Sequence, residues 1–228
     1  MDGFEKMGKI IVIEGTDASG KQTQTDLLYD ILKKDNNNVM KLTFPDYKSE
    51  TSIFVRMYLE GKFGDSADSV DAKTASVFNA ADRYASYKLK WEEFIKKEDS
   101  IIIFDRYVTS NMVHQAAKYD DIDKKNEFLD WVYDFEYNIL GLPKPDKVIF
   151  LNMRYDLALK LMEKRNNKIT DESEKDIHER DSEYMKKCYE NACFVAKKYN
   201  WNEVKCFDGD KIRTIEDIHN EIRKIVCN

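Results

Sequence analysis

The chain contains few of the residues that build metal and redox sites. It has three histidines and four cysteines, and all four cysteines lie in its C-terminal part, at Cys188, Cys193, Cys206 and Cys227. No two of them form a Cys-x-x-Cys pair. Cys188 lies on a helical stripe of apolar residues, which predicts core packing rather than a metal or redox role. Disulfides are not expected either, because no secretion signal is recognisable.

Long apolar runs and a signal-like N-terminus are also absent. The longest apolar runs are a few residues long, and residues 1–6 lack the pattern of a signal peptide. The net charge of −6 and the pI of about 5.3 disfavour a general surface for nucleic acid or anionic membrane, while leaving room for a local basic cleft. We therefore expect a cytoplasmic protein with neither nucleic acid nor membrane as a partner.

Apolar residues make up 42 % of the 228 residues, which is enough to build a core. Short β-branched segments alternate with helical periodicity along the whole chain. The expected strands are 9–13, 39–43, 101–104, 148–151 and 204–207, and the expected helices are 21–33, 72–96, 124–140 and one from 214. In the third helix, Phe128, Phe135 and Ile139 are expected on one face. The alternation predicts an α/β fold, a parallel five-stranded sheet with helices on both faces that binds ligands beyond the carboxyl ends of its strands.

A glycine-bracketed loop follows the first predicted strand and precedes a predicted helix. Gly15 and Gly20 allow backbone angles at which successive N–H groups can wrap phosphate oxygens, and Lys21 can reach the transferable phosphate. The alternative is an ordinary strand-to-helix turn that contains two glycines and a lysine. The context favours a P-loop. Its expected ATP-binding residues are Gly15, Thr16, Asp17, Ala18, Ser19, Gly20, Lys21, Gln22 and Thr23.

Gln22 departs from the strict P-loop pattern, which has Ser or Thr after the lysine to offer a hydroxyl to Mg²⁺. Thr23 comes one position late. Metal ligation must therefore rely on carboxylates or water, and Asp17 and Asp105 are the candidates.

The predicted strand 101–104 ends in a charged pair, Asp105–Arg106. Arg106 can clamp a phosphate with two parallel hydrogen bonds, and Asp105 can hold Mg²⁺ through water or restrain the arginine. The alternative is a structural ion pair at the sheet edge. Downstream, Ser110, Asn111, His114 and Gln115 supply donors and acceptors suited to a base and a sugar.

Residues 164–181 are highly charged and nearly devoid of large apolar side chains. This segment is either a solvated surface loop or a lid that lowers basic groups onto phosphates. Because internal repeats and Gly/Ser linkers are also absent, we expect residues 1–228 to form a single P-loop domain with a lid at about 164–181.

An ordered set of motifs resembles the thymidylate kinase family over essentially the whole chain. The motifs are Gly15 to Thr25, Phe44-Pro45, Ala81-Asp82-Arg83, Asp105-Arg106-Tyr107 with Ser110-Asn111, Pro145-Asp146, His178-Glu179-Arg180 and Asp208-Gly209. Thymidylate kinases are P-loop kinases that phosphorylate dTMP with Mg-ATP. The resemblance therefore implies ATP as phosphoryl donor, Mg²⁺ as cofactor and a homodimer.

The resemblance also implies roles for individual residues. Asp17 accepts the sugar 3′-hydroxyl, Arg83 and Asn111 read the base, and Arg106 grips the monophosphate. The implied dTMP-binding residues are Asp17, Phe44, Tyr47, Phe78, Arg83, Arg106, Asn111 and His114. Phe78 enters this set because Asn79 stands where a stacking phenylalanine is common. Asp46 likewise stands where many members have arginine, and Asn152 replaces a common aspartate.

Ala18 occupies the position where some members carry a catalytic arginine, so the chain resembles the bacterial-type group whose lid supplies the charge. Arg165, Lys168 and Arg180 are the lid candidates, and Glu179 is a further candidate metal ligand beside Asp17 and Asp105. The expected catalytic residues are Lys21, Arg106, Asp105, Arg165 and Arg180. The expected reaction is transfer of the ATP γ-phosphoryl group to dTMP. The alternatives are a kinase for another monophosphate, such as dUMP or dGMP, and a catalytically silent nucleotide-binding module.

Overall fold

The computed structural model describes residues 8–166 and 181–227, with side chains described up to residue 163 in the first part. The strands are β1 (Lys9–Glu14), β2 (Val39–Thr43), β3 (Ile101–Asp105), β4 (Lys147–Asn152), β5 (Asn202–Lys205), β6 (Phe207–Asp208) and β7 (Lys211–Ile212). The α-helices are α1 (Lys21–Asp35), α2 (Ile53–Leu59), α3 (Ala72–Ser86), α4 (Glu92–Ile95), α5 (Val108–Ser110), α6 (Ile122–Tyr133), α7 (Tyr155–Asn166), α9 (Ser182–Lys198) and α10 (Ile215–Cys227). Shorter 3₁₀ or π turns are η1 (Glu50–Ser52), η2 (Ala67–Ser69), η3 (Tyr87–Trp91), η4 (Asn111–Gln115), η5 (Ala116–Lys118) and η6 (Asp134–Ile139).

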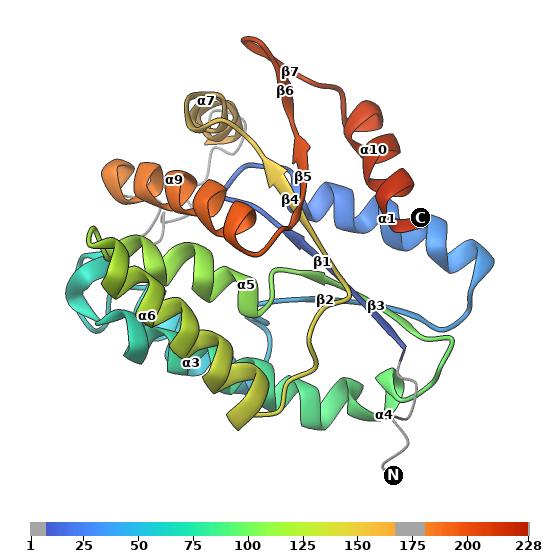
Figure 1. Ribbon diagram of the computed structural model, residues 1–228, viewed down its shortest axis with the longest axis horizontal. Helices are drawn as coiled ribbons and strands as arrows, with labels where there is room; N and C mark the ends of the chain where they lie inside the picture. Colours follow the sequence, from blue (N-terminus) through green and yellow to red (C-terminus); the bar gives the residue numbers. More distant parts are fainter. Residues whose placement is uncertain (1–7, 167–180, 228) are drawn as a thin grey trace.

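The centre of the fold is a parallel five-stranded sheet in the order β2-β3-β1-β4-β5 (Figure 1). The predicted α/β sheet with helices on both faces is confirmed. In the register, Ile13 and Thr43 both lie opposite Asp105. The segments that leave β1, β2 and β3 therefore start from the same edge of the sheet, where ligands of parallel sheets bind.

Successive residues of β1 pack into different layers because strand side chains alternate between faces. Ile10 and Val12 belong to the cluster that contains Trp91 and Phe128, and Ile11 and Ile13 belong to the cluster with helices α1 and α10. Figure 1 shows α1 and α10 together on one side of the sheet and α3, α6 and α9 on the other. Burying each large apolar side chain contributes about 1.5–3 kcal/mol, so both layers hold the sheet.

The last strand lies earlier than predicted. β5 covers residues 202–205 rather than 204–207, and Phe207 instead pairs with Ile212 in the antiparallel β6–β7 hairpin. Val204 is the only buried residue of β5, so the sequence carries no apolar alternation that would mark the start of this strand.

Two predicted helices are interrupted by π-helical turns. The predicted helix 72–96 is divided into α3, η3 and α4, and the helix 124–140 widens from α6 into η6. A wider turn rotates the inward face of the helix. The expectation that Ile139 shares one face with Phe128 is therefore wrong: Phe128 is buried but Ile139 is 69 % exposed, and Glu136 and Tyr137 are buried instead.

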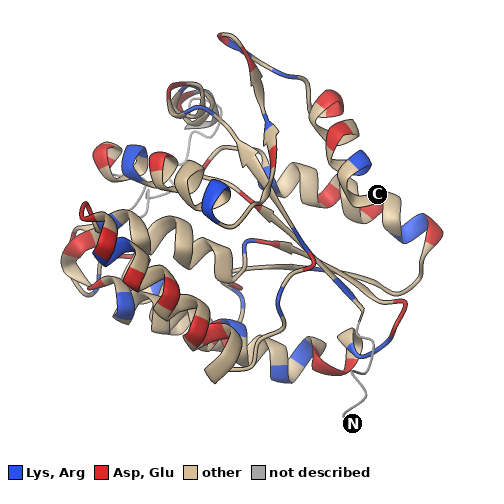
Figure 2. Ribbon diagram, in the orientation of Figure 1, with Lys and Arg blue, Asp and Glu red and all other residues tan. Residues whose placement is uncertain are grey.

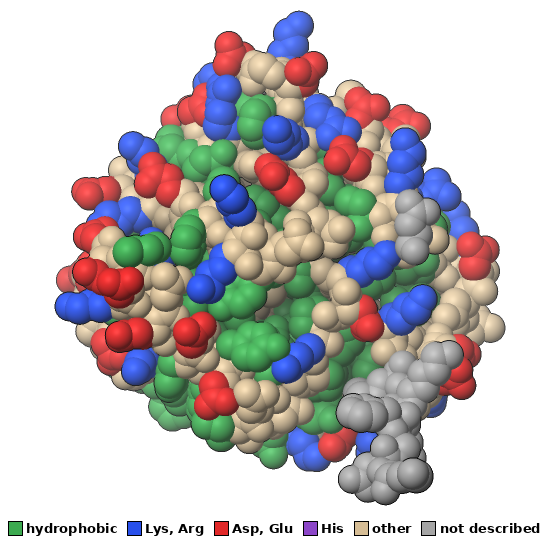
Figure 3. Space-filling model, in the orientation of Figure 1, with side chains coloured by type: hydrophobic (Ala, Val, Ile, Leu, Met, Phe, Trp, Pro, Cys, Tyr) green, Lys and Arg blue, Asp and Glu red, His purple; other side chains and the backbone are tan. Residues whose placement is uncertain are grey.

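None of the helices in the described ranges is both long and apolar enough to cross a membrane. Acidic and basic residues occur together along the outer helices (Figure 2), and both signs are interspersed over the face drawn in Figure 3. The polar groups that matter for a ligand are instead gathered at the carboxyl edge of the sheet.

Candidate functional site

The loop between β1 and α1 has the backbone geometry of a phosphate cradle. A Cβ at Gly15 would lie 2.6 Å from Ser19 Oγ and 3.0 Å from the backbone oxygen of Leu151, so a side chain there would force Ser19 and the neighbouring backbone to shift. Gly20 has φ +87° and precedes the first turn of the 15-residue helix α1. Ala18 also adopts a left-handed conformation, at φ +57°. The N–H groups at this helix start are arranged to receive an anion.

Among the polar side chains of the loop, Ser19 is buried, whereas Gln22 and Thr23 are exposed to solvent. Ser19 Oγ is buried and has no hydrogen-bond partner among the described residues. Gln22 and Thr23 are exposed on the first turn of α1. An unpaired buried hydroxyl inside a phosphate cradle fits a ligand oxygen that would complete its hydrogen bonding.

Lys21 is buried beneath the loop, and its Nζ donates to the backbone oxygen of Thr16 at 2.7 Å. Burial, followed by repulsion from Arg106, lowers the pKa of Lys21 to about 8. The nearby carboxylates act in the opposite direction but do not cancel this effect. An anionic ligand would offset the cost of keeping the buried ammonium group charged. Lys21 is thus held ready for phosphate.

Arg106 connects the loop to the end of β3. Its Nη2 donates to Asp17 Oδ1, and its Nη1 lies 2.7 Å from His114 Nε2. Because arginine only donates, Nε2 of His114 must be the acceptor and Nδ1 carries the ring proton. Burial favours the neutral guanidine, but the carboxylates of Asp17 and Glu14 outweigh it and raise the pKa of Arg106. Arg106 also has φ +67°, a strained conformation typical of functional sites.

Glu14 is a site residue that the sequence reading missed. This fully buried carboxylate accepts from Thr109 Oγ1 at 2.6 Å, from Ser110 Oγ at 2.8 Å and from the N–H of Gly15 at 2.9 Å. It also lies 3.9 Å from Arg106. A lone glutamate that ends an apolar strand was the available signal. Glu14 fixes the start of the P-loop relative to α5.

Asp105 is the described residue that best fits a metal ligand through water. Its carboxylate receives no hydrogen bond within the described ranges, and burial raises its pKa against the opposing charges of Lys21 and Arg106. Asp17, not Asp105, is the carboxylate that restrains Arg106. Since the described residues contain no group of three His, Cys, Asp or Glu side chains that could hold a metal ion, a Mg²⁺ would need phosphate oxygens or water as further ligands.

A cleft with an empty volume of about 750 Å³ opens beside the P-loop. It is lined by Asp17, Phe44, Pro45, Tyr47, Val55, Tyr58, Leu59, Asn79, Arg83, Arg106, Ser110, Asn111, His114 and Gln115. Seven of the eight residues expected to bind the acceptor nucleotide therefore line a single cleft. The wall from α2, with Val55, Tyr58 and Leu59, was not anticipated, because nothing in that short helix marks it as a ligand contact.

Phe78 is the exception. Its ring packs against Phe54 at 5.7 Å and Phe63 at 5.6 Å between centroids, and its neighbour Asn79 lines the cleft. The register of α3 thus points Phe78 to another side of the helix, and the expected stacking contact is not formed by this geometry. Phe44, which is buried against Phe104 and Tyr107, is the aromatic wall nearest the sheet.

The segment after β2 is tied to α3 by a buried aspartate. Asp82 accepts from the N–H of Asp46 at 3.1 Å and from Thr51 Oγ1 at 2.6 Å. Asp46 itself pairs with Lys90 at 2.5 Å. The aspartate that stands in place of a common arginine is therefore neutralised by a lysine of η3.

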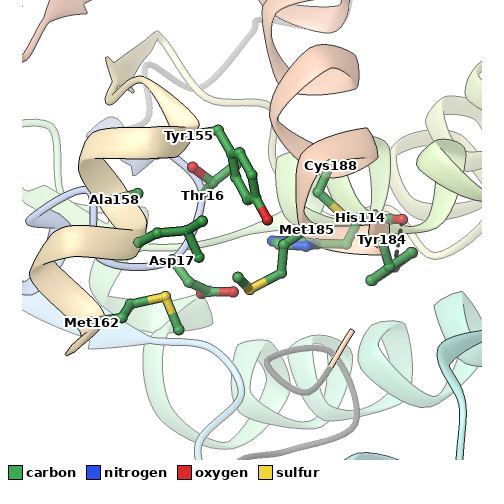
Figure 4. Close-up of a pocket in the computed structure, with 10 residues that line it drawn as sticks. Thr16, Asp17, His114, Tyr155, Ala158, Met162, Tyr184, Met185 and Cys188 are labelled. Carbon is green, nitrogen blue, oxygen red and sulfur yellow. Dashed lines mark hydrogen bonds between the residues drawn. The ribbon is translucent and has the colours of Figure 1, made fainter. Parts of the chain in front are cut away.

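A smaller cavity, with an empty volume of about 360 Å³, adjoins the cleft, and Asp17 and His114 line both. Figure 4 shows Tyr155 and Met162 reaching toward it from α7 and Met185 from α9. Tyr184 of α9 donates to the backbone oxygen of His114 at 2.7 Å, which fixes one side of this cavity. Its lining is mainly apolar.

Apart from Asp181, the side chains of the predicted lid lie outside the described part of the chain. Arg165 belongs to the last turn of α7, but its side chain lies outside the described residues, and so do Lys168, Glu179 and Arg180. The described chain resumes with Asp181, whose side chain accepts from the N–H of Tyr184 and caps α9.

Comparison with known proteins gives one consistent result. The family model described as thymidylate kinase matches residues 13–222. The chain is 30 % identical over 231 residues to a thymidylate kinase of Plasmodium falciparum, covering 99 % of this chain and 93 % of that protein. It is 26 % identical to a thymidylate kinase of Danio rerio, covering 98 % and 92 % of the two chains. The solved thymidylate kinase of Candida albicans superposes with a TM-score of 0.68 at 22 % identity, covering 96 % and 91 % of the two chains, which supports the P-loop fold.

Proposed function

Because the chain belongs to the thymidylate kinase family, we propose that it transfers the γ-phosphoryl group of ATP to dTMP, giving dTDP and ADP. The observation that carries this proposal is the position of the acceptor cleft. Groups suited to a base, Arg83 and Asn111, and a phosphate-binding cation, Arg106, line the same cleft, which opens beside the P-loop. A monophosphate bound there would face the γ-phosphate held by the loop.

The reaction needs positioning and charge neutralisation rather than a covalent intermediate, because the acceptor oxygen is already anionic. The backbone N–H groups from Gly15 to Lys21 would hold the donor phosphates. Lys21 and Arg106 would reduce the repulsion between the two nucleotides, Lys21 from the donor side and Arg106 from the acceptor side.

Mg²⁺ would be held through water by Asp105, with Asp17 and the lid residue Glu179 as further candidates. When bound, it neutralises charge on the donor phosphates. Asp105 suits this task because its carboxylate feels the positive charges of Lys21 and Arg106 and accepts no hydrogen bond from the described residues.

In the acceptor cleft, Phe44 would contact the base, Arg83 and Asn111 would read its polar edge, and Asp17 would accept the 3′-hydroxyl of the sugar. Gln115 supports a sugar or base contact as well: its Oε1 is buried and has no partner in the described part of the chain. Tyr47 and His114 complete the polar rim of the cleft.

The remaining parts of the proposal are a single domain with a lid at about 164–181, a cytoplasmic location and a homodimer. We propose that basic lid residues, Arg165, Lys168 or Arg180, complete the charge around the transferring group.

Exposed apolar side chains on α2, α3 and η3 support a dimer interface. These are Ile53, Phe54, Val77, Tyr84 and Leu89. Sedimentation equilibrium should give twice the 26.9 kDa chain mass, and a monomer at all concentrations would contradict the interface.

The reaction is tested by measuring ADP release with Mg-ATP and a panel of monophosphates. We expect dTMP to have the highest kcat/KM, with dUMP, dGMP and dCMP lower. Faster turnover of dUMP or dGMP would favour a kinase for that substrate. Tight ATP binding without dTMP-dependent ADP release would instead indicate a silent nucleotide-binding module.

A further inference from the structure

We infer that Glu136 is a specificity-determining positioning residue: by fixing the polarity of Asn111 and Arg83, it makes the cleft select a base with an imide edge. The inference rests on the proposed acceptor cleft and deepens it. Glu136 does not line the cleft itself and would act only through the two residues that do.

Glu136 lies in the π-helical turn η6 and is fully buried. Its two oxygens accept from Arg83 in a bidentate pair, with Nε and Nη2 each at 2.7 Å. Oε1 also accepts from Asn111 Nδ2 at 2.7 Å. One carboxylate from η6 thus holds a side chain of α3 and a side chain of η4.

The orientation of the Asn111 amide follows from chemistry. Its Nδ2 has two hydrogens, and they point to Glu136 Oε1 and to the backbone oxygen of Ser76 at 3.2 Å. The reversed amide would place a carbonyl oxygen against a carboxylate and a second carbonyl, which is repulsive. Both donors of Asn111 are therefore committed inside the protein. The polar atom that it can offer to the cleft is the acceptor Oδ1.

Arg83 offers the opposite polarity. It is 1 % exposed yet lines the cleft, and its guanidinium carries only donors. Glu136 takes the Nε hydrogen and one hydrogen of Nη2, so the donors left for a ligand are those of Nη1 and the second hydrogen of Nη2. Asn111 therefore presents an acceptor and Arg83 presents donors to the base.

This pattern matches an imide edge. Thymine and uracil show a ring N3–H donor beside an O4 acceptor, and guanine shows N1–H beside O6. Cytosine and adenine show the reverse, a ring-nitrogen acceptor beside an amino donor. A site with buried, oriented polar groups rejects the reversed pattern strongly, because wrong pairing leaves those groups without partners. A carboxylate is what enforces it, since Glu136 can only accept.

The test is Glu136→Gln, which keeps the shape of the side chain but replaces one acceptor with an NH₂ donor. That donor can pair with the Asn111 carbonyl oxygen, so only the Ser76 oxygen still favours the original amide orientation and the reversed amide, with Nδ2 toward the cleft, becomes accessible. We expect the ratio of kcat/KM for dTMP over dCMP to fall at least about tenfold, the size of effect that one well-placed base contact supplies. The KM for ATP should not change, because the P-loop is untouched.

Glu221→Gln is the matched control. It makes the same chemical change in an ion pair with Arg213, whose Nη1 donates to Glu221 at 2.7 Å, away from the cleft residues. Its dTMP-to-dCMP ratio should equal that of the unchanged protein. A Glu136→Gln protein with an unchanged ratio, or with equal losses for both substrates, would overturn the role of Glu136.

A measurement on the unchanged protein keeps the inference testable if Glu136→Gln does not fold. The side-chain amide protons of Asn111 should be protected from exchange without ligand and should stay protected when dTMP binds. Rapid exchange in the free protein would contradict the claim that both Nδ2 hydrogens of Asn111 are hydrogen-bonded inside the protein. Failure of the proposed function would appear separately, as an unchanged protein that does not prefer dTMP in the panel.

Discussion

At the scale of single residues, the site is built from cations kept charged in buried surroundings. Lys21 and Arg106 are each placed near carboxylates, and each has a pKa shifted by burial and by its charged neighbours. Charges fixed in advance stabilise a transition state at little reorganisation cost. We therefore expect turnover to depend on Arg106 and ATP affinity to depend on the protonation of Lys21.

Arg106→Ala should lower kcat with dTMP by about a hundredfold or more, the usual cost of losing one pre-placed stabilising group. The reason is loss of the cation that would face the acceptor phosphate. Steady-state ADP release measures the effect. Arg213→Ala, which also removes an arginine paired with a carboxylate, should keep nearly full turnover. Near-normal turnover of Arg106→Ala would contradict its assigned role.

The affinity for ATP should decrease above pH 8. Lys21 has a pKa of about 8 in the free protein, so it is increasingly neutral at higher pH and must take up a proton to pair with phosphate. Below pH 8 no proton uptake is needed, and the affinity should be level. Linkage predicts up to about a tenfold weaker affinity per pH unit above the free-state pKa. Titration calorimetry in buffers of different ionisation enthalpy measures both affinity and proton uptake; no uptake at pH 9 would refute the assignment.

At the scale of elements, the loop and the π-helical turns determine where side chains point. Gly15 is enclosed by Ser19 and by the Leu151 backbone, so the P-loop is shaped by β4 as well as by its own sequence. The turns η4 and η6 bring Asn111 and Glu136 into contact. Such turns are common at functional sites because they re-aim side chains without ending the helix.

Gly15→Ala should weaken ATP binding by at least about tenfold, because the new Cβ would collide with Ser19 Oγ and with backbone, and shift the cradle by several tenths of an ångström. Gly141→Ala is the control: Gly141 has φ +68° but open space around it. That control should lose about 1–2 kcal/mol of stability from backbone strain and keep its ATP affinity. Equal ATP affinities of the two variants would show that the close packing at Gly15 is unimportant.

At the scale of the whole molecule, ligand binding should raise the thermal stability of the fold. The cleft brings together segments that follow β1, β2 and β3 as well as α2 and α3, so a nucleotide there would hold separate parts of the chain together. At a dTMP concentration of 100 times its Kd, binding linkage should increase the free energy of unfolding by about 2.7 kcal/mol. For a chain of this size that corresponds to a rise in Tm of roughly 5 to 10 °C. Differential scanning fluorimetry measures it. A Tm unchanged by dTMP, with ATP still stabilising, would argue against the acceptor cleft.

Local pattern was sufficient for much of the fold. The strand, glycine loop and helix from Lys9 to Asp35 could be predicted because apolar runs, glycines and helical periodicity are all encoded within a few residues of one another. The parallel direction of the strands, though not their order in the sheet, followed from the alternation of strands and helices. β5 was misplaced because an edge strand with one buried residue leaves little periodic signal.

The sequence by itself determined the chemistry available to this protein: a glycine-bracketed loop with Lys21, a charged pair Asp105–Arg106 at a strand end, and the ordered motifs that resemble the thymidylate kinase family, since each depends on residue type and short spacing. Only the tertiary structure decided which partners those groups have. Glu14, Asp82 and Glu136 hold the site through long-range contacts between residues 25 to 96 positions apart, and Phe78 is turned away by the register of its helix. Contacts across such separations are set by how the layers pack, and no local pattern of residues records them.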